Sequence, residues 1–423
     1  MPTPYRWIQP SLATLHKANW HRRVLPIQGM TGPVVTIQGR QMVNLASNDY
    51  LGFAGEPQLM ERAIAAIQTY GTGATGSRLL SGHRDLHLEL EAAIAQLKGT
   101  EAAIVFSSGY LANLGTITAI VNHRDLILAD EYNHSSLKNG AALSGAHALS
   151  YRHCDIKDLE DKLQQHRATY RRALILTDAV FGMDGDACPL IQILDLADNF
   201  DAMVMIDEAH SAGVLGERGA GCAEHFGCSH RPMIQMGTLS KAFASLGGYV
   251  AGSAELIDFL RNRAPSWIYT TGLSPADTAA ALGAIAQLNQ ELTRQPNRLT
   301  QLHQNARYLS QQLDRLLAEL LTELPSVQMQ YLKRLPTDSA IVCLQVKDAA
   351  TVLALSHQLK EQGIFVSAVR PPTVPISRLR MSVMATHTTA QLDRCVAALR
   401  QCLSQPQKVS LHGDTSDPKL IEI

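Results

Sequence analysis

The central part of the chain alternates short apolar runs with amphipathic stretches, and this alternation limits the folds open to it. The apolar runs lie at 102–106, 126–129, 174–178, 202–207, 233–237 and 248–252. Amphipathic stretches such as 85–97 and 190–200 separate or flank them. Strands that are apolar on both faces and alternate with helices indicate a mostly parallel sheet flanked by helices. We therefore predict a large α/β domain whose ligands bind beyond the carboxyl ends of the strands.

The last third of the chain is organised differently. Strand-like runs lie at 339–346, 364–369 and 378–384, and helical patterns lie at 349–362 and 389–403. Gly363 stands where the first of these helices should end, as glycine does after many helices. This region predicts a second, smaller α+β domain.

The expected boundaries divide the chain into four segments. These are an N-terminal segment, 1–50, that joins or bridges to the small domain, the large domain at 51–285, the small domain at 286–404 and a polar tail at 405–423.

Composition excludes several classes of protein. Hydrophobic residues make up 46% of the 423 residues and charged residues 18%, so the chain can bury a large core. A net charge of -1 gives no reason to expect a nucleic-acid or membrane partner. Seven scattered cysteines imply no disulfide framework, and no signal peptide or spanning segment is evident. We therefore expect a cytoplasmic protein.

Lys241 is the only charged residue of the segment MGTLSKAFASLGGYV (236–250). Thr238 and Ser240 offer hydroxyl groups that suit a phosphate, and the two glycines that follow let a bulky group approach the backbone. A lysine can form a Schiff base with an aldehyde, and pyridoxal phosphate is an aldehyde that also needs a phosphate site. A solvated surface position is the commoner fate of a single lysine, so the neighbours carry this prediction.

The run AMVMIDEAHSAG supplies partners for such a cofactor. Asp207 ends an apolar strand, and its carboxylate could keep the ring nitrogen protonated. His210 follows within reach of the ring's phenolic oxygen. The letters DEAH also occur in helicases, but this chain has no G-x-x-x-x-G-K-[ST] loop.

Two further strand ends complete the predicted site. VFSSGYLANLGTITAI reads as a strand, a turn and a helix, so Gly109 and Tyr110 could hold a phosphate at the helix start. His134, in EYNHSSL after another strand, could stack on the ring, although a lone histidine is more often structural. These residues share one expected edge of the sheet, which a purely structural protein would not require.

A zinc site is the competing interpretation of another segment. GCAEHFGCSH contains Cys222, His225, Cys228 and His230. The spacing matches no common zinc pattern, so we predict an ordinary loop and no metal.

Seven motifs together are similar to those of the α-oxoamine synthases, which are fold type I pyridoxal-phosphate transferases. They are SNDYLGF (47–53), YGTGATGSRLLSG (70–82), FSSGYLAN (106–113), FGMDGD (181–186), DEAHSAG (207–213), TLSKAF (238–243) and RPPTVP (370–375). The resemblance spans roughly residues 20 to 400, with the motifs in the family's order.

The resemblance implies a role for each predicted cofactor residue. Lys241 would bind the cofactor aldehyde and later move the substrate α-proton. Asp207 would pair with the ring nitrogen, His210 with the phenolic oxygen, and His134 would stack on the ring. The residues implied to hold the rest of the cofactor are Gly109, Tyr110 and Thr238.

The resemblance also implies substrate and subunit contacts. Arg380 would clamp the amino-acid carboxylate, which suits a guanidinium fork. Arg22 and Thr373 would lie near the acyl chain. Thr270 or Thr271 would reach the phosphate of a neighbouring subunit, so the family's homodimer is implied. Alternative assignments remain for the two arginines, because other arginines lie close to each in the sequence.

The segment VRPPTVPISRLRMSV favours members of the family that condense L-alanine with a pimeloyl thioester, carried by coenzyme A or an acyl-carrier protein, in biotin biosynthesis. The alternatives are a relative that uses glycine or serine with a different acyl thioester, a plain aminotransferase and a non-enzymatic binding protein. One position departs from the family pattern, because Gly182 replaces a serine that would bond the phenolic oxygen. We expect this change to weaken or retune the cofactor site.

Overall fold

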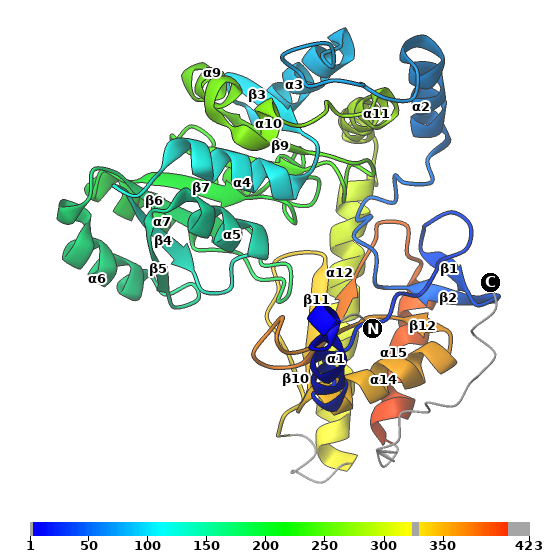
Figure 1. The fold of residues 1–423 in the computed structure, drawn as a ribbon. Coiled ribbons are helices and arrows are strands. Elements are labelled where there is room, and N and C mark those ends of the chain that lie inside the picture. The colour runs from blue at the N-terminus through cyan, green and yellow to red at the C-terminus, as the bar shows by residue number, and fades with distance from the viewer. Residues whose placement is uncertain (1–2, 324–329, 405–423) are drawn as a thin grey trace.

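The computed structural model describes residues 3–323 and 330–404 (Figure 1). The predicted polar tail, 405–423, lies outside the described residues. Within the described ranges, no helix combines the length and the apolar character needed to cross a membrane.

A seven-stranded sheet forms the larger part of the molecule (Figure 1). Its strands are β3 (Ala102–Phe106), β4 (Leu126–Asp130), β5 (His147–Tyr151), β6 (Ala173–Asp178), β7 (Met203–Asp207), β8 (Ile234–Thr238) and β9 (Gly248–Gly252). Their order is β3-β9-β8-β7-β6-β4-β5, and β9 alone runs antiparallel to its neighbours. The prediction of a mostly parallel α/β sheet is confirmed.

Helices cover both faces of this sheet, as a largely parallel sheet requires. One face carries α4 (Gly109–Ile120), α5 (Ser135–Ser144), α9 (Ala254–Arg263) and α10 (Pro265–Ile268). The other carries α2 (Pro57–Tyr70), α3 (Asp85–Lys98), α6 (Ile156–His166), α7 (Leu190–Asn199), α8 (Cys222–His225) and α11 (Pro275–Glu291). Successive strand residues face opposite helical layers. Leu174 packs with the first layer and Ile175 with the second.

A second unit has its own core and its own sheet. The sheet is antiparallel, in the order β10 (Lys333–Arg334), β11 (Ile341–Gln345), β14 (Arg378–Ser382) and β13 (Ser367–Val369). Among the described residues, its helices are α12 (Arg298–Glu323), α14 (Ala349–Glu361) and α15 (Thr389–Ser404). Gly363 adopts φ +75° just after α14, a left-handed conformation that glycine reaches without a steric clash because it has no Cβ.

The N-terminal segment adds η1 (Thr3–Tyr5), α1 (Ile8–Lys17), β1 (Val34–Ile37) and β2 (Arg40–Asn44), and η2 (Arg167–Thr169) follows α6. β2 pairs in parallel with β12 (Ile364–Phe365), which ties the N-terminal hairpin to the C-terminal part of the chain. The predicted single strand 364–369 is therefore wrong in one respect. Its two ends pair with different sheets, and buried Val366 separates them. The domain boundaries stay a prediction.

Candidate active site

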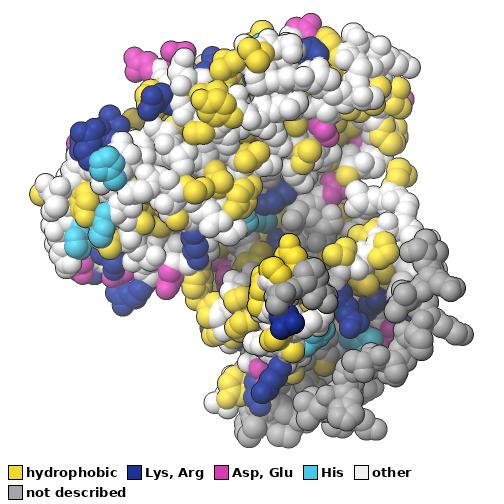
Figure 2. Space-filling model, viewed as in Figure 1, with side chains coloured by type: hydrophobic (Ala, Val, Ile, Leu, Met, Phe, Trp, Pro, Cys, Tyr) yellow, Lys and Arg dark blue, Asp and Glu magenta, His cyan; other side chains and the backbone are white. Residues whose placement is uncertain are grey.

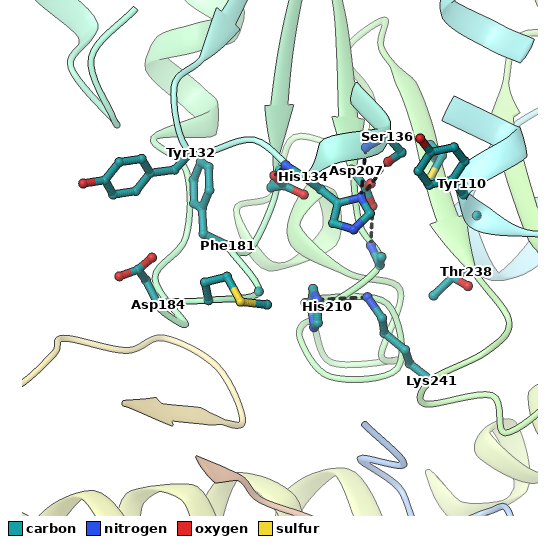
Figure 3. Close-up of a pocket in the computed structure, with 16 residues that line it drawn as sticks. Tyr110, Tyr132, His134, Ser136, Phe181, Asp184, Asp207, His210, Thr238 and Lys241 are labelled. Atoms are coloured by element: carbon teal, nitrogen blue, oxygen red, sulfur yellow. Dashed lines mark hydrogen bonds between the residues drawn. The ribbon is translucent and has the colours of Figure 1, made fainter. Parts of the chain in front are cut away.

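A pocket of about 210 Å³ lies at the carboxyl ends of β6, β7 and β8 and at the start of α4 (Figure 3). All seven residues predicted to contact the cofactor within one chain line it, namely Gly109, Tyr110, His134, Asp207, His210, Thr238 and Lys241. They come from separate segments of the sequence, and the parallel strands bring them together because their carboxyl ends share one edge of the sheet.

Lys241 is half-buried and lies in the turn between β8 and β9. Its Nζ lies 2.9 Å from Nε2 of His210. Burial lowers the pKa of the Lys241 ammonium to about 8, and nearby Arg380 acts in the same direction against the opposing effect of Asp207. Burial and the neighbouring Lys241 also hold the pKa of His210 well below its usual range. The site therefore favours a neutral imidazole beside an amine that deprotonates readily.

Asp207 ends β7 and is buried at the bottom of the pocket. Its Oδ2 accepts a hydrogen bond from Nδ2 of Asn113 at 2.7 Å, and its Oδ1 accepts one from the backbone N–H of Ala209 at 2.9 Å. Within the described residues, this carboxylate takes part in no ion pair. A buried carboxylate held only by neutral donors can still receive a cationic N–H from a ligand.

A short chain of hydrogen bonds connects Asp207 to His134. Nδ2 of Asn113 also donates to Oγ of Ser136 at 2.8 Å, and Oγ lies 2.7 Å from Nδ1 of His134 (Figure 3 shows the second contact). His134 caps the start of α5, so both its backbone and its ring are held. Sequence reasoning missed Asn113 and Ser136, although both lie inside the motifs that it singled out.

Asp178 is a second buried carboxyl group of the pocket that sequence reasoning missed. It ends β6 directly beside Asp207 in the strand register, and its Oδ2 accepts the backbone N–H of His134 at 2.6 Å. Burial and the negative charge of Asp207 raise the pKa of Asp178 well above its usual range. Its position at a strand end, in LILTD, was the available signal.

The start of α4 leaves room for a phosphate to approach the backbone, as the sequence predicts. Ser108 caps the helix by accepting from the backbone N–H of Leu111 at 3.2 Å. A Cβ on Gly109 would lie 3.2 Å from Cβ of Thr238, so glycine keeps this corner open. Orphan N–H groups at a helix start favour an anion, as a phosphate requires. Tyr110 lies beside them, and its hydroxyl contacts Asn139.

Gly182 lies against His210. A Cβ at this position would lie 2.3 Å from Nε2 of His210, so any larger residue would displace the imidazole from the place it holds beside Lys241. Glycine at position 182 is therefore required for the position that the His210 ring occupies.

The structure brings two of the predicted substrate residues together. Nη2 of Arg22 donates to Oγ1 of Thr373 at 3.1 Å, at an exposed position outside the pocket lining. Arg380 is buried in β14, where its Nε donates to the carbonyl of Gly182 at 2.5 Å and its Nη2 to Oδ1 of Asn48 at 3.0 Å. Arg380 thus borders the pocket wall without lining it.

The neighbouring alternatives for these arginines have different surroundings. Arg378 is buried and forms an ion pair with Asp184. Arg23 is exposed and forms no side-chain hydrogen bond within the described part of the chain. Thr270 and Thr271 lie outside the pocket of their own chain, and the carbonyl of Thr271 accepts from Oγ of Ser107 at 2.9 Å.

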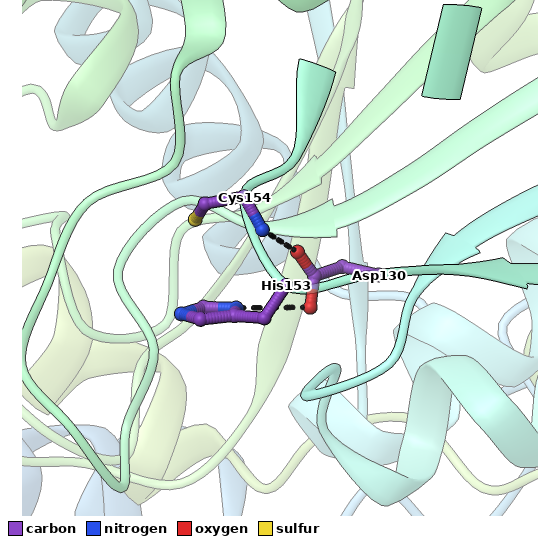
Figure 4. Close-up of side chains that lie close together, drawn as sticks. All are labelled: Asp130, His153 and Cys154. Atoms are coloured by element: carbon purple, nitrogen blue, oxygen red, sulfur yellow. Dashed lines mark hydrogen bonds and ion pairs between the residues drawn. The ribbon is translucent and has the colours of Figure 1, made fainter. Parts of the chain in front are cut away.

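The four residues of the competing zinc interpretation do not form a cluster. Cys222 and Cys228 are buried, and each thiol contacts a backbone carbonyl. Among the described residues, the group of potential metal ligands that does lie close together is Asp130, His153 and Cys154 (Figure 4).

The hydrogen bonds of His153 account for this second group without a metal ion. Its Nδ1 lies 3.1 Å from Oδ1 of Asp130, and its Nε2 lies 2.9 Å from Oδ2 of Asp186 (Figure 4 shows the first contact). Burial alone would lower the pKa of His153, but the hydrogen bonds to both carboxylates outweigh it and raise the pKa to about 12. An imidazolium between two carboxylates connects the FGMDGD loop to the end of β4.

Comparisons with known proteins agree with this geometry. The sequence pattern of the family described as "Aminotransferase class I and II" matches residues 40–399. A Nostoc punctiforme protein named "Putative 8-amino-7-oxononanoate synthase" is 59% identical over 400 residues, which cover 95% of this chain and 97% of that protein.

Two solved structures share the fold over most of their length. Serine palmitoyltransferase from S. paucimobilis, with a bound PLP-myriocin aldimine, has a TM-score of 0.85 at 27% identity and covers 95% of this chain and 97% of its own. The 8-amino-7-oxononanoate synthase of Francisella tularensis has a TM-score of 0.69 at 27% identity and covers 85% of this chain and 97% of its own.

The chain therefore belongs to the class I and II aminotransferase family, which has the fold type I architecture and uses pyridoxal phosphate. Within that family it falls among the α-oxoamine synthases and is similar to the 8-amino-7-oxononanoate synthases. The predictions of this family, of a pyridoxal-phosphate-dependent acyltransferase and of its cofactor are confirmed. The donor set of the pocket fits that cofactor, with an amine, a buried carboxylate, two imidazoles and an open helix start.

Proposed function

We propose that the protein condenses L-alanine with a pimeloyl thioester and releases carbon dioxide and a free thiol. The product is 8-amino-7-oxononanoate, an intermediate of biotin biosynthesis. The observation that carries the proposal is the meeting of Lys241, His210 and Asp207 in one pocket. The similarity to the named relatives supports the choice of substrates.

Pyridoxal phosphate supplies an electron sink that accepts the electron pair left when a bond to the amino acid's Cα breaks. Asp207 has the position and the charge to hold a proton on the ring nitrogen, which keeps that sink effective. Nδ2 of Asn113 holds the Asp207 carboxylate through a 2.7 Å hydrogen bond to Oδ2. Asn113 is neutral, so the negative charge of the carboxylate has no ion-pair partner within the described chain. The His134 ring, held through Ser136, offers a flat surface to the cofactor.

Lys241 is the base that we assign to the α-proton. Its pKa of about 8 leaves a substantial fraction of the side chain as free amine at neutral to mildly basic pH. The 2.9 Å contact with His210 orients Nζ toward the pocket (Figure 3). The same amine can later return a proton to the same carbon.

The proposed reaction balances with one proton from solvent, because protons are added to sulfur and to Cα and Lys241 returns only the one that it removed. L-Alanine loses its α-proton to Lys241, and the Cα electron pair forms a bond to the thioester carbonyl carbon. The C–S bond breaks, and the sulfur leaves as a thiol after it takes up a proton. The carboxylate then leaves as carbon dioxide, and a proton returns to Cα. The pocket's contribution is to orient the amino acid so that one bond at Cα breaks at a time.

We assign the remaining contacts to substrates. Arg380, next to the pocket wall, has a rigid fork of donors that suits the amino-acid carboxylate. Arg22 and Thr373 form an exposed polar pair that we assign to the acyl donor.

We further propose that the active unit is a homodimer. Thr270 and Thr271 lie at the surface of their own chain, available to a neighbouring subunit's phosphate site. Helix α1 contains no buried residue, and Figure 2 shows hydrophobic side chains at the surface in its region. Exposed apolar surface of this kind is typical of an interface.

The experiment that tests the function is thiol release from pimeloyl-coenzyme A with L-alanine, glycine or L-serine in parallel. Release with L-alanine alone, matched by formation of 8-amino-7-oxononanoate, is the expected result. Release with glycine or L-serine alone would contradict the choice of amino acid.

The structural likeness to serine palmitoyltransferase makes L-serine the most informative of these alternatives. A long-chain acyl thioester should therefore be tested beside the pimeloyl thioester. Pimeloyl-carrier protein should be tested as the third donor.

A further inference from the structure

Tyr50 is a wholly buried residue that connects the pocket to Arg380. Its hydroxyl lies 2.7 Å from Nδ1 of His210 and 3.3 Å from Oδ1 of Asn48. His210 contacts Lys241 through its other ring nitrogen, Nε2. A continuous series of polar contacts therefore runs from Arg380 through Asn48, Tyr50 and His210 to Lys241.

The hydrogen positions in this series of contacts follow from its donor and acceptor groups. A guanidinium has donors only, so the Asn48 atom that faces Arg380 must be the carbonyl oxygen. Tyr50 has one hydroxyl hydrogen, which can go to that oxygen or to Nδ1 of His210. The contact to Nδ1 is shorter by 0.6 Å, the difference between the 2.7 Å and 3.3 Å separations. Oδ1 of Asn48 already accepts a hydrogen bond from the charged guanidinium of Arg380.

The hydroxyl of Tyr50 therefore donates to Nδ1, which leaves the single proton of a neutral His210 on Nε2. We propose that Tyr50 is a positioning residue that holds His210 in the Nε2–H tautomer, so that a hydrogen-bond donor faces Lys241 and the pocket. A donor at Nε2 favours the free amine of Lys241 and disfavours its ammonium form. The inference rests on the proposed roles of Lys241 and His210, and it does not depend on which substrates are condensed.

The charges around the pair agree with a neutral imidazole. Lys241, Arg380 and His134 face His210, and each opposes a positive charge on its ring. Burial also raises the pKa of Tyr50 to about 12, so its hydroxyl keeps the hydrogen that it donates. Lys241 additionally faces the carboxylates of Asp207 and Asp178, which favour its ammonium form. Tyr50 favours the free amine indirectly, through its hydrogen bond to His210.

The first test reads the tautomer directly. The full-length protein, labelled with 15N-histidine, would be compared with Tyr50→Phe by NMR, with and without pyridoxal phosphate, with His210→Gln used only to assign the signal. We expect Nε2 to carry the proton in the unmodified protein and the Nδ1–H form to gain population in Tyr50→Phe. A proton on Nδ1 in the unmodified protein, or an unchanged ring signal in Tyr50→Phe, would overturn the proposal.

The second test reads the consequence for Lys241. Covalent capture of pyridoxal phosphate by cofactor-free protein forms a C=N bond, releases water and needs the free amine. Its rate should rise with pH through a midpoint near the Lys241 pKa of about 8. Loss of one hydrogen bond should raise that midpoint in Tyr50→Phe by about half to one pH unit. A midpoint that stays the same or falls would contradict the proposal.

Tyr249→Phe is the matched control. Tyr249 is equally buried, and its hydroxyl has no hydrogen-bond partner among the described residues. The same atom is removed, so the His210 signal and the capture midpoint should both stay unchanged. An equal response in this variant would show a general packing effect and overturn the specific role of Tyr50. Neither test uses L-alanine or an acyl thioester, so a different substrate would leave both results interpretable.

Discussion

The carboxyl end of the seven-stranded sheet and the Arg22–Thr373 pair differ in how firmly they hold their functional groups. At the sheet end, Asp207 is buried and connected through Asn113 to further side chains. Arg22 and Thr373 meet through one exposed hydrogen bond between segments 351 residues apart. Buried, cross-connected groups are positioned by the fold, whereas an exposed pair gains little from one contact.

From this difference we infer that the two regions have different roles in the reaction. Chemistry that all family members share needs fixed geometry, and the sheet end provides it. The choice of acyl donor can vary with exposed segments that do not disturb the core. If this comparison is correct, changes at the sheet end should abolish chemistry, and changes at the exposed pair should alter substrate binding.

The largest expected effect is at Lys241. Lys241→Ala removes the amine that we assign to cofactor capture and proton transfer, so thiol release should fall below detection and the cofactor's lysine-bound absorbance should disappear. Lys157→Ala, at an exposed lysine paired with Asp161, is the control and should behave like the unmodified protein. Residual L-alanine-dependent turnover in Lys241→Ala would remove this lysine from the mechanism.

Asp207→Asn should have the second-largest effect. The amide keeps the shape of the side chain but loses the charge that favours a protonated ring nitrogen. We expect kcat/KM to fall by about 100-fold or more, the scale of one lost preorganised electrostatic contact. Asp198→Asn, at an exposed carboxylate that pairs with Arg231, should leave kcat/KM unchanged. A loss of less than threefold in Asp207→Asn would contradict the proposed pairing.

Gly182→Ala tests the position of His210. The added methyl group would meet Nε2 at 2.3 Å, so the ring must move away from Lys241. We expect kcat to fall about tenfold, consistent with one lost hydrogen bond beside the base. Circular dichroism should stay unchanged, because Gly182 has no left-handed backbone that would strain alanine. Unchanged kcat, with the ring shown by NMR to keep its environment, would argue against the proposed constraint.

The smallest effect is expected at the exposed pair. Arg22→Ala should raise KM for the acyl thioester about three- to tenfold, as expected for one lost charged contact, and leave kcat nearly unchanged. Arg23→Ala is the neighbouring control and should change neither constant. A fall in kcat with an unchanged KM would place Arg22 in the chemistry and break the comparison between the two regions.

Much of the fold was predictable because its strands are buried on both faces. The six predicted strands of the large sheet lie within a residue or two of those observed. β5 escaped prediction because it is an edge strand with a mostly exposed, mixed sequence, HALSY. A strand that packs against one neighbour lacks the continuous apolar run that marks a central strand.

The lining of the pocket was predictable only in part. Lys241, Asp207 and His210 stand at strand ends with distinctive neighbours, so their motifs reveal them. Asn113 and Tyr50 act through contacts 94 and 160 residues away, and no local pattern in the sequence encodes such contacts.

The sequence alone determined the alternation of strands and helices, the order of the motifs and the chemical groups at the strand ends, because these depend on local hydrophobic period and residue type. Only the tertiary structure decided which ring nitrogen of His210 meets Lys241, that Asp178 lies beside Asp207, and that Gly182 leaves room for the imidazole. These depend on strand register and side-chain packing. Both arise from contacts between residues that are distant in the chain.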